Sequence, residues 1–195
     1  MGPMRSSEVP PLDEAERRWL IDVAWGSIRH GLAQGSSARP DLDGFHGRLR
    51  QPGAAFVTLH RLGVLRGCIG HLEATQPLVL DVADNAFAAA FRDPRFERLE
   101  DWELDGLDLD ISVLTAPQPI EFRDEADLLA QLVPGEDGLI LEGEGRRGTF
   151  LPAVWDGLPE PHLFLAELKR KAGLPASYWS PTLKVSRYHT ETFGR

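Results

Sequence analysis

The amino-acid sequence predicts an α+β fold made of two similar strand-strand-helix-strand units with antiparallel hairpins, plus an N-terminal helix. Three observations support this class: two pairs of short strand-like segments are each joined by a brief turn, each pair is followed by a helical pattern and a further strand, and an amphipathic segment precedes both. The 195 residues suffice to bury a substantial core. We expect a single domain over residues 12–193, made of two intimately packed subdomains, about 12–120 and 121–193.

An amphipathic helix is expected from Leu12 to Gln34. Asp13 can cap its first turn, and Glu16 three positions later completes a capping box. Gly35 suits the left-handed residue that commonly ends a helix. Apolar side chains at helical spacing define one buried face: Trp19, Leu20, Val23, Ala24, Ile28 and Leu32. We expect this face to cover a sheet.

The first unit begins with a hairpin. Strands are expected over Ala54 to His60 and Val64 to Gly70, joined by a short turn. A proline-led helix follows from Pro77 to Phe91, and Asp93-Pro94 ends it, since proline disfavours helical geometry in the residue before it. Apolar and polar side chains alternate from Leu107 to Leu114, which predicts a strand with one buried face.

The same order of elements recurs after residue 120. The expected elements are a short helix (124–132), two strands (138–142 and 147–151), a helix (161–172) and a last strand (183–189). Arg147-Gly148 in the second unit resembles Arg66-Gly67 in the first. The pattern favours two similar halves, each with an antiparallel hairpin and a flanking helix.

The most informative segment, residues 65–70, reads Leu-Arg-Gly-Cys-Ile-Gly and holds the chain's only cysteine. Side chains alternate faces along a strand, so Leu65 and Ile69 are expected to face the core while Arg66 and Cys68 project together from the other side. A cationic neighbour favours the reactive thiolate form of a cysteine. The alternative is that Cys68 packs as a small apolar side chain, as unpaired cysteines usually do.

This segment and several later ones resemble the AMMECR domain family. The further matches follow in the family's order: Phe91–Phe96 (F-R-D-P-R-F), Ile111–Pro117 (I-S-V-L-T-x-P), Gly148–Pro152 (G-T-F-L-P), Lys171–Pro175 (K-A-G-L-P) and Trp179. The resemblance spans roughly residues 12–193. Bacterial members are called AmmeMemoRadiSam system protein A, which implies a Memo-type protein and a radical SAM (S-adenosylmethionine) enzyme as partners. It implies no particular reaction.

The resemblance also implies a site around the Leu65–Gly70 strand. In the family, the F-R-D-P-R-F segment lies near that strand, so Arg66 and Arg95 are expected to hold an anionic group of a small ligand jointly, with Asp93 orienting one of them. The alternative is purely structural, because Asp93-Pro94 also suits the end of a helix. The candidate ligand-binding set is completed by three nearby residues: Gly67, Gly70 and Asn85.

Two functions remain open. The first is a ligand- or partner-binding module with a cleft around the strand, whose glycines permit close backbone approach. The second is a cysteine-dependent enzyme acting on a small anionic metabolite, with Cys68 as nucleophile and His71 or His46 as base. The module is preferred, because the sequence places no base beside the thiol. A third option is that the motif is architectural only.

The composition limits the classes of partner and the cellular compartment that we expect. A formal net charge of −9 argues against nucleic acid, which needs a basic stripe. No run approaches the roughly 18 apolar residues of a membrane span, and residues 1–11 lack the apolar stretch of a signal peptide. One cysteine forbids an internal disulfide, so the cytoplasm is expected. Residues 97–144 hold fifteen carboxylates against Arg98 and Arg123, which predicts a solvated face or a docking surface for a basic partner.

Metal and cofactor sites are not expected. The six histidines are scattered, and Cys68 with His71 gives one C-x-x-H pair, fewer ligands than a zinc site needs. Residues 143–148 match G-x-G-x-x-G, but they run into a strand-like segment rather than opening a helix. A hairpin turn is therefore expected there.

Overall fold

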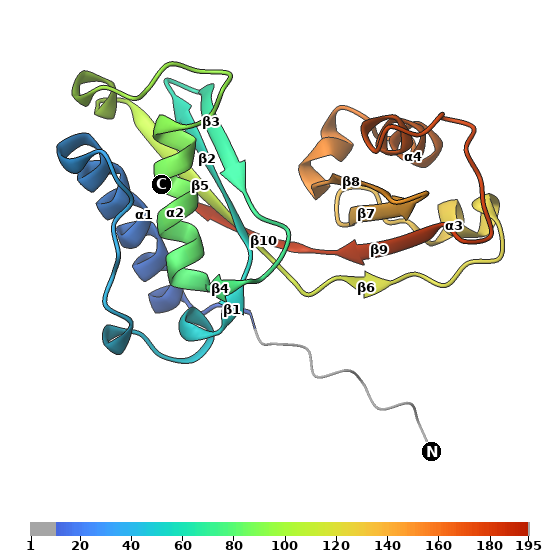
Figure 1. Cartoon of the computed structure of the whole chain (residues 1–195), viewed down its shortest axis with the longest axis horizontal. Coiled ribbons are helices and arrows are strands. Elements are labelled where there is room, and N and C mark those ends of the chain that lie inside the picture. Colours follow the sequence, from blue (N-terminus) through green and yellow to red (C-terminus); the bar gives the residue numbers. More distant parts are fainter. Residues whose placement is uncertain (1–10, 195) are drawn as a thin grey trace. The chain divides into compact units, whose positions relative to one another are not determined.

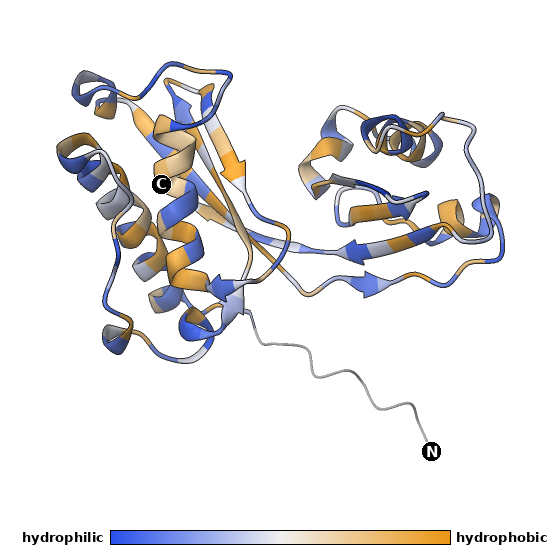
Figure 2. Cartoon of the chain, viewed as in Figure 1, coloured by the Kyte–Doolittle hydropathy of each residue, from blue (hydrophilic) through white to orange (hydrophobic). Residues whose placement is uncertain are grey.

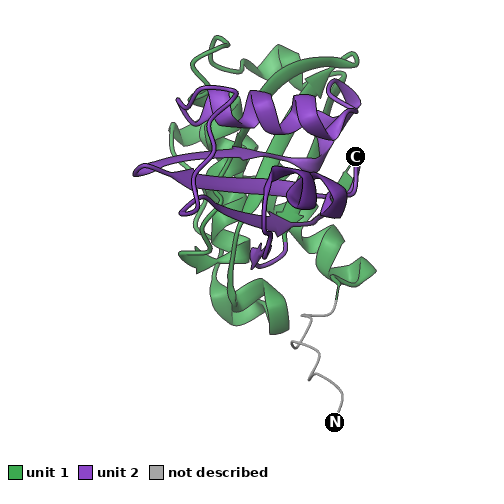
Figure 3. Cartoon of the chain, turned by 90° about the vertical axis from the view of Figure 1, so that its right-hand side faces the viewer, with its two compact units in different colours: residues 1–114, 191–195 green, residues 115–190 purple. Residues whose placement is uncertain are grey.

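The computed structural model describes residues 11–194, which form two compact units (Figure 1, Figure 3). Unit 1 comprises the chain up to Leu114 together with residues 191–194, and unit 2 comprises Thr115–Thr190. The division therefore falls before the expected boundary at residue 120, and the C-terminal residues belong to the first unit. Residues 1–10, on which the expectation about a signal peptide largely rests, lie outside the described residues. Within residues 11–194, no helix combines the length and apolar character needed to cross a membrane.

The described residues form mixed helices and short antiparallel strands. The α-helices are α1 (Glu14–Gln34), α2 (Leu78–Phe91), α3 (Glu125–Gln131) and α4 (Pro161–Lys171). The 3-10 helices are η1 (Leu42–Gly44), η2 (Gly47–Arg50), η3 (Asp101–Leu104) and η4 (Pro152–Asp156). The strands of the first unit are β1 (Pro52–Gly53), β2 (Ala55–Arg61), β3 (Val64–Gly70), β4 (Gln76–Pro77), β5 (Leu107–Leu114) and β10 (Thr190–Gly194). Those of the second are β6 (Gln118–Pro119), β7 (Gly138–Gly143), β8 (Arg146–Phe150) and β9 (Lys184–Tyr188).

Unit 1 is built on a four-stranded sheet in the order β10-β5-β2-β3, with α1 and α2 on one face (Figure 1). Alternate residues of β2 and β5 are fully buried against the helices, among them Val57, Leu59, Leu109 and Ile111. This alternation is what a sheet with one covered face requires. The other face of β2 and β5 carries mainly polar side chains, with Phe56 as an exception.

The N-terminal helix begins and ends where the sequence predicts. Asp13 accepts the Glu16 backbone N–H at 2.8 Å and the Glu16 side chain returns the bond, so the expected capping box is present. Gly35 ends the helix with a φ of 71°. α1 packs mainly against α2 and contacts the sheet at β5 and β10. Trp19 is exposed, contrary to its expected place on the buried face.

Unit 2 repeats the arrangement with a sheet in the order β6-β9-β7-β8. Its core gathers around Phe164 of α4, which is fully buried and stacks on Trp155 at 3.7 Å between ring centroids. Glu144 and Gly145 adopt left-handed conformations between β7 and β8. The expected hairpin turn is therefore confirmed, and the G-x-G-x-x-G match is not a dinucleotide loop.

The two units share one plan, as the sequence predicts. In each, the first hairpin strand (β2 or β7) lies between its hairpin partner (β3 or β8) and the strand after the helix (β5 or β9). Gly67 pairs with Leu59 and Gly148 with Leu141, at matching positions. An added Cβ would lie 2.1 Å from the Ala89 carbonyl oxygen at Gly67, and 2.9 Å from a helix-end side chain at Gly148. Each glycine thus lets a helix end approach its strand.

Candidate functional site around β3

β3 is the edge strand of the first sheet, and two side chains close part of its free edge. The Cys68 backbone N–H donates to Asp93 Oδ2 at 2.9 Å, and Arg95 Nη2 donates to the Cys68 carbonyl at 3.2 Å. Asp93 and Arg95 are themselves joined by two bonds of 2.9 and 2.7 Å. The pair therefore occupies the backbone groups that a further strand would use at this point.

The contacts between Asp93 and Arg95 favour the charged form of both side chains. The Arg95 guanidinium holds the pKa of the buried Asp93 carboxyl well below its usual range; burial opposes this shift, and the Cys68 N–H supports it. In return, Asp93 raises the pKa of Arg95. An ionised, buried carboxylate at this position is stable only because four N–H donors, one from Cys68 and three from Arg95, surround it.

The Cys68 thiol lies on the face of β3 away from α2. Gly67 faces α2, so the next residue points to the opposite side. Cys68 pairs across the strands with Thr58, whose Oγ1 donates to the sulfur at 3.3 Å. Gly70 leaves room for Phe56 on the same face, because an added Cβ would lie 2.3 Å from that ring. Cys68 as a residue is half-buried.

Arg66 departs from the expected alternation. The pairing of β2 with β3 shifts at this point, so that Leu65 pairs with His60 and Arg66 is the unpaired extra residue of a bulge. Leu65 is consequently exposed instead of forming a core pair with Ile69. Arg66 donates to both oxygens of Glu103, at 2.7 and 2.9 Å, and to the Glu97 carbonyl at 2.9 Å.

The two arginines lie near the same aromatic ring, but most of their donors are engaged. The guanidinium carbons of Arg66 and Arg95 are 5.9 and 5.4 Å from the Phe96 centroid. Arg66 is bound to Glu103 and Arg95 to Asp93. The remaining Arg66 nitrogen, Nη1, is buried without a hydrogen-bond partner. An anion held jointly by these arginines would have to displace two carboxylates.

The sequence offered His71 and His46 as bases for Cys68, and the structure places His71 elsewhere. His71 Nδ1 contacts Asp81 Oδ1 at 2.6 Å, on the α2 side of the sheet. His46 is exposed at the start of η2. The histidine on the thiol's face is His60, two residues beyond Thr58 on β2. Its Nδ1 lies 3.6 Å from Asp110 Oδ2. The hairpin register, which the turn length constrains, is the sequence signal that could have indicated His60.

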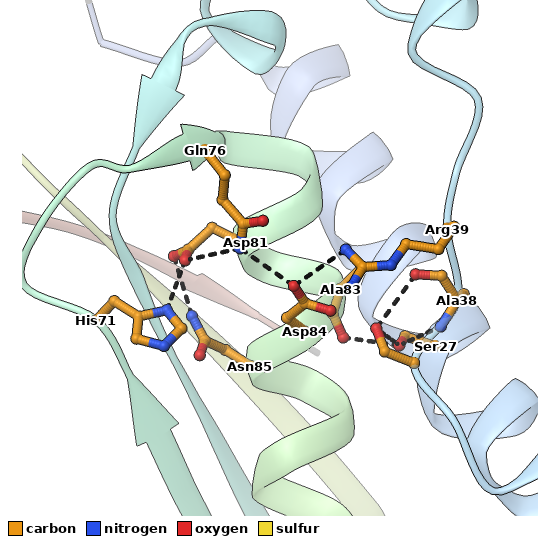
Figure 4. Close-up of polar contacts among 10 residues, drawn as sticks. Ser27, Ala38, Arg39, His71, Gln76, Asp81, Ala83, Asp84 and Asn85 are labelled. Carbon is orange, nitrogen blue, oxygen red and sulfur yellow. Dashed lines mark hydrogen bonds and ion pairs between the residues drawn. The ribbon is translucent and has the colours of Figure 1, made fainter.

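Asn85 belongs to a buried polar group on α2. Figure 2 shows α2 as a mainly hydrophobic helix that hydrophilic residues interrupt. Figure 4 shows His71, Gln76 and Asn85 arranged around the Asp81 carboxylate. Asp81 accepts the Ala55 N–H at 2.9 Å, and Asn85 Nδ2 donates to the Ala55 carbonyl at 3.0 Å. Burial raises the pKa of Asp81, with His71 opposing the shift. This group holds the start of β2 on α2, and Asn85 Oδ1 has no partner.

Large apolar side chains gather at the β2–β3 turn, a feature that the sequence reasoning missed. We call the exposed set the hairpin patch; its members and exposed fractions are Leu62 (74%), Val64 (69%), Leu65 (38%) and Trp102 (62%). Trp102 joins the turn because the Arg61 guanidinium lies 4.6 Å from its ring centroid. The Leu62 N–H also donates to Gly106, two residues after η3.

An open pocket of about 280 Å³ borders the hairpin patch. Arg66 lines it from β3, and side chains between Phe96 and Glu103 line the rest. The Arg66–Glu103 ion pair crosses from β3 to η3 and so fixes the segment that carries Trp102 to the hairpin. Among residues 11–194, no group of three or more metal-ligating side chains is gathered.

Comparison with known proteins agrees with this architecture. A family model named AMMECR1 matches residues 21–193. The chain belongs to the AMMECR1 family. A protein from Methanothermobacter thermautotrophicus is 37% identical over 194 residues, covering 94% of this chain and 96% of that protein. A protein from Saccharolobus solfataricus is 37% identical over 194 residues, covering 93% of this chain and 82% of its own.

A solved structure is also similar to this chain. The crystal structure of an uncharacterized protein from Pyrococcus horikoshii superimposes with a TM-score of 0.82 at 34% sequence identity. The match covers 91% of this chain and 92% of that one. The α+β fold is thus shared with a protein whose structure was determined by crystallography.

Proposed function

We propose that this AMMECR1-family protein is a binding module that docks a partner protein through the hairpin patch. The observation that carries the proposal is the exposure of four large apolar side chains at one place, beside an open pocket. Isolated exposed apolar residues are ordinary, whereas a contiguous exposed group marks an interaction surface. The patch adjoins the Leu65–Gly70 strand, where the sequence reasoning expects a cleft.

In this proposal, the motif residues hold the docking surface in a fixed shape. Gly67 allows α2 to pack directly on β3, and Asp93 with Arg95 fixes the strand's free edge at Cys68. Arg66 binds Glu103 and so joins the hairpin to η3. A surface that is rigid before binding loses less entropy on association. Small-ligand binding by Arg66 and Arg95 is less favoured, since both guanidinium groups are engaged with carboxylates.

The family resemblance supplies the partners to test, which are a Memo-type protein and a radical SAM enzyme, and the cytoplasm is the proposed location of this protein. The affinity of each purified protein for the full chain is measured by calorimetry, with Leu65→Ser and Trp102→Ala as test variants. Leu163→Ser is the matched control, because Leu163 is an exposed leucine in unit 2. We expect a loss of tenfold or more for the test variants, about the 1.4 kcal/mol or more of an interface anchor, and none for the control. Equal affinities for all variants would reject the proposal.

A cysteine-dependent enzyme is the second candidate, favoured by one observation. Thr58 pairs with both Cys68 and Asp110, so His60 is a diagonal neighbour of both residues on the same face. His60 would take the thiol proton, and Cys68 would attack an electrophilic carbon of a small anionic metabolite. The bond from that carbon to its leaving group would break, and the leaving group would depart with the proton from His60. The rate of alkylation of Cys68 by iodoacetamide tests this function. The enzyme requires His60→Ala to slow the reaction, whereas the binding module predicts equal rates for His60→Ala, Arg66→Met and wild type.

A further inference from the structure

The charge around the hairpin patch is predominantly negative. Glu97 and Glu100 lie in the pocket and are exposed, and Asp101 and Asp105 flank Trp102 in the sequence and are also exposed. Arg98 is the exposed cation of the pocket lining. Because Arg66 and Glu103 neutralise each other, the remaining lining carries two carboxylates against one guanidinium.

Arginine side chains already lie near the aromatic rings of the hairpin patch and of the adjoining pocket. The Arg61 guanidinium lies 4.6 Å from the Trp102 centroid, and two more guanidinium groups lie within 6 Å of the Phe96 centroid. The ring faces attract cations, most strongly for tryptophan. Trp102 is well exposed, so a cation from outside can reach its ring as well as the neighbouring carboxylates.

From this combination we infer that the segment docking on the hairpin patch is apolar and basic, and that it places a lysine or arginine side chain in the adjoining pocket. The inference rests on the proposed function and specifies its partner. The apolar residues of the segment cover Leu62, Val64 and Leu65. Its cation is attracted to Glu97 and to the face of Trp102.

Other occupants fit the charge less well. An acidic or phosphorylated segment would meet exposed carboxylates of its own sign around the pocket. A second copy of this chain carries the same formal charge of −9 and would bring the same acidic rim against itself. Complementary charge therefore selects a basic partner segment.

Selection of peptides from a random 12-residue display library tests the inference. The full chain is the bait, and Trp102→Ala serves for counter-selection, so the recovered peptides depend on the hairpin patch. Chosen peptides are then synthesised and titrated against wild type, Glu97→Gln and Glu136→Gln. Glu136 is an exposed glutamate of unit 2 and provides the matched control.

We expect the recovered peptides to pair apolar residues with lysine or arginine. Glu97→Gln should weaken them about two- to fivefold, as for one exposed ion pair, and Glu136→Gln should leave the affinity unchanged. Two results would overturn the inference without contradicting the binding module. One is that peptides whose binding depends on Trp102 are acidic or uncharged, and the other is that Glu97→Gln leaves their affinity unchanged. Recovery of no peptide that depends on Trp102 would overturn both.

Discussion

Asp93 accepts the backbone N–H of Cys68 at 2.9 Å, although the two residues are 25 positions apart. The bond gives the Leu65–Gly70 strand and the Phe91–Phe96 segment a shared structural role. Asp93 follows the end of α2, and Cys68 lies on the strand that α2 covers. Their contact fixes the end of the helix to the edge of the sheet, and Arg95 completes it.

Asp93→Asn should destabilise the protein by about 1–3 kcal/mol at neutral pH. The substitution removes one acceptor oxygen and the charge, so Cys68 N–H and Arg95 compete for a single oxygen. The share due to Arg95 is reduced by solvent, because that side chain is half exposed. Urea unfolding followed by circular dichroism measures the change. Asp105→Asn, at an exposed aspartate, serves as control and should have little effect.

The same carboxylate predicts a dependence of stability on pH. Because the folded pKa of Asp93 is depressed, its contribution is present above the unfolded carboxyl pKa of about 3.9 and is lost as pH falls through the lower folded value. Arg66 likewise lowers the pKa of Glu103, so the stabilising contribution of Glu103 is also lost as the pH falls. The free energy of unfolding should therefore drop below about pH 4, and less steeply in Asp93→Asn. Identical acid slopes in the two proteins would contradict the ionised Asp93–Arg95 pair.

Gly67→Ala should destabilise the protein by about 1–3 kcal/mol or more, because the new Cβ would meet the Ala89 carbonyl oxygen of the rigid helix backbone. Gly148→Ala should cost less, since its nearest neighbour would lie 2.9 Å away rather than 2.1 Å. Gly44→Ala is the control, with no atom within 4 Å of the added methyl group. Thermal unfolding ranks the three variants, and a neutral Gly67→Ala would show that α2 does not need this close approach.

Asn85→Ala should cost about 1–3 kcal/mol, since it removes a buried donor from the Ala55 carbonyl and from Asp81. His71→Ala should cost less than about 1 kcal/mol, because the His71 side chain is half exposed. Urea unfolding at pH 7 compares the two. The reverse order would indicate that His71, rather than Asn85, holds the start of β2 on α2.

Local signals in the sequence predicted most of the fold. The capping box of α1 and the alternation of β5 depend on residues a few positions apart, so their patterns can be recognised without knowledge of tertiary contacts. β10 was not predicted as a separate strand of unit 1, because it pairs with a strand about 80 positions earlier and has no local pattern of its own. Trp19 was wrongly assigned to the core. The spacing of apolar residues shows which face of a helix is apolar, but it does not show how far around the helix the buried region extends.

The candidate site was predicted only in outline. Asp93 and Arg95 are neighbours in the sequence, so an Asp–Arg contact was a simple expectation. The partner of Arg66 was not predictable, since several carboxylates follow in the chain and no spacing distinguishes Glu103. The bulge at Arg66 also turned Leu65 outward, and a strict two-residue alternation cannot anticipate this change. The hairpin patch depends on that reversal.

Amide hydrogen exchange, measured with and without a bound partner protein, tests the central claim most directly. Saturating Memo-type protein or radical SAM enzyme is added to the full chain, and peptides spanning residues 61–66 and 96–103 are followed. The account predicts slower exchange in both segments on binding, and no such change in the presence of either protein for Trp102→Ala. Protection confined to unit 2 or to the polar face around Thr58, with the hairpin patch unchanged, would contradict it.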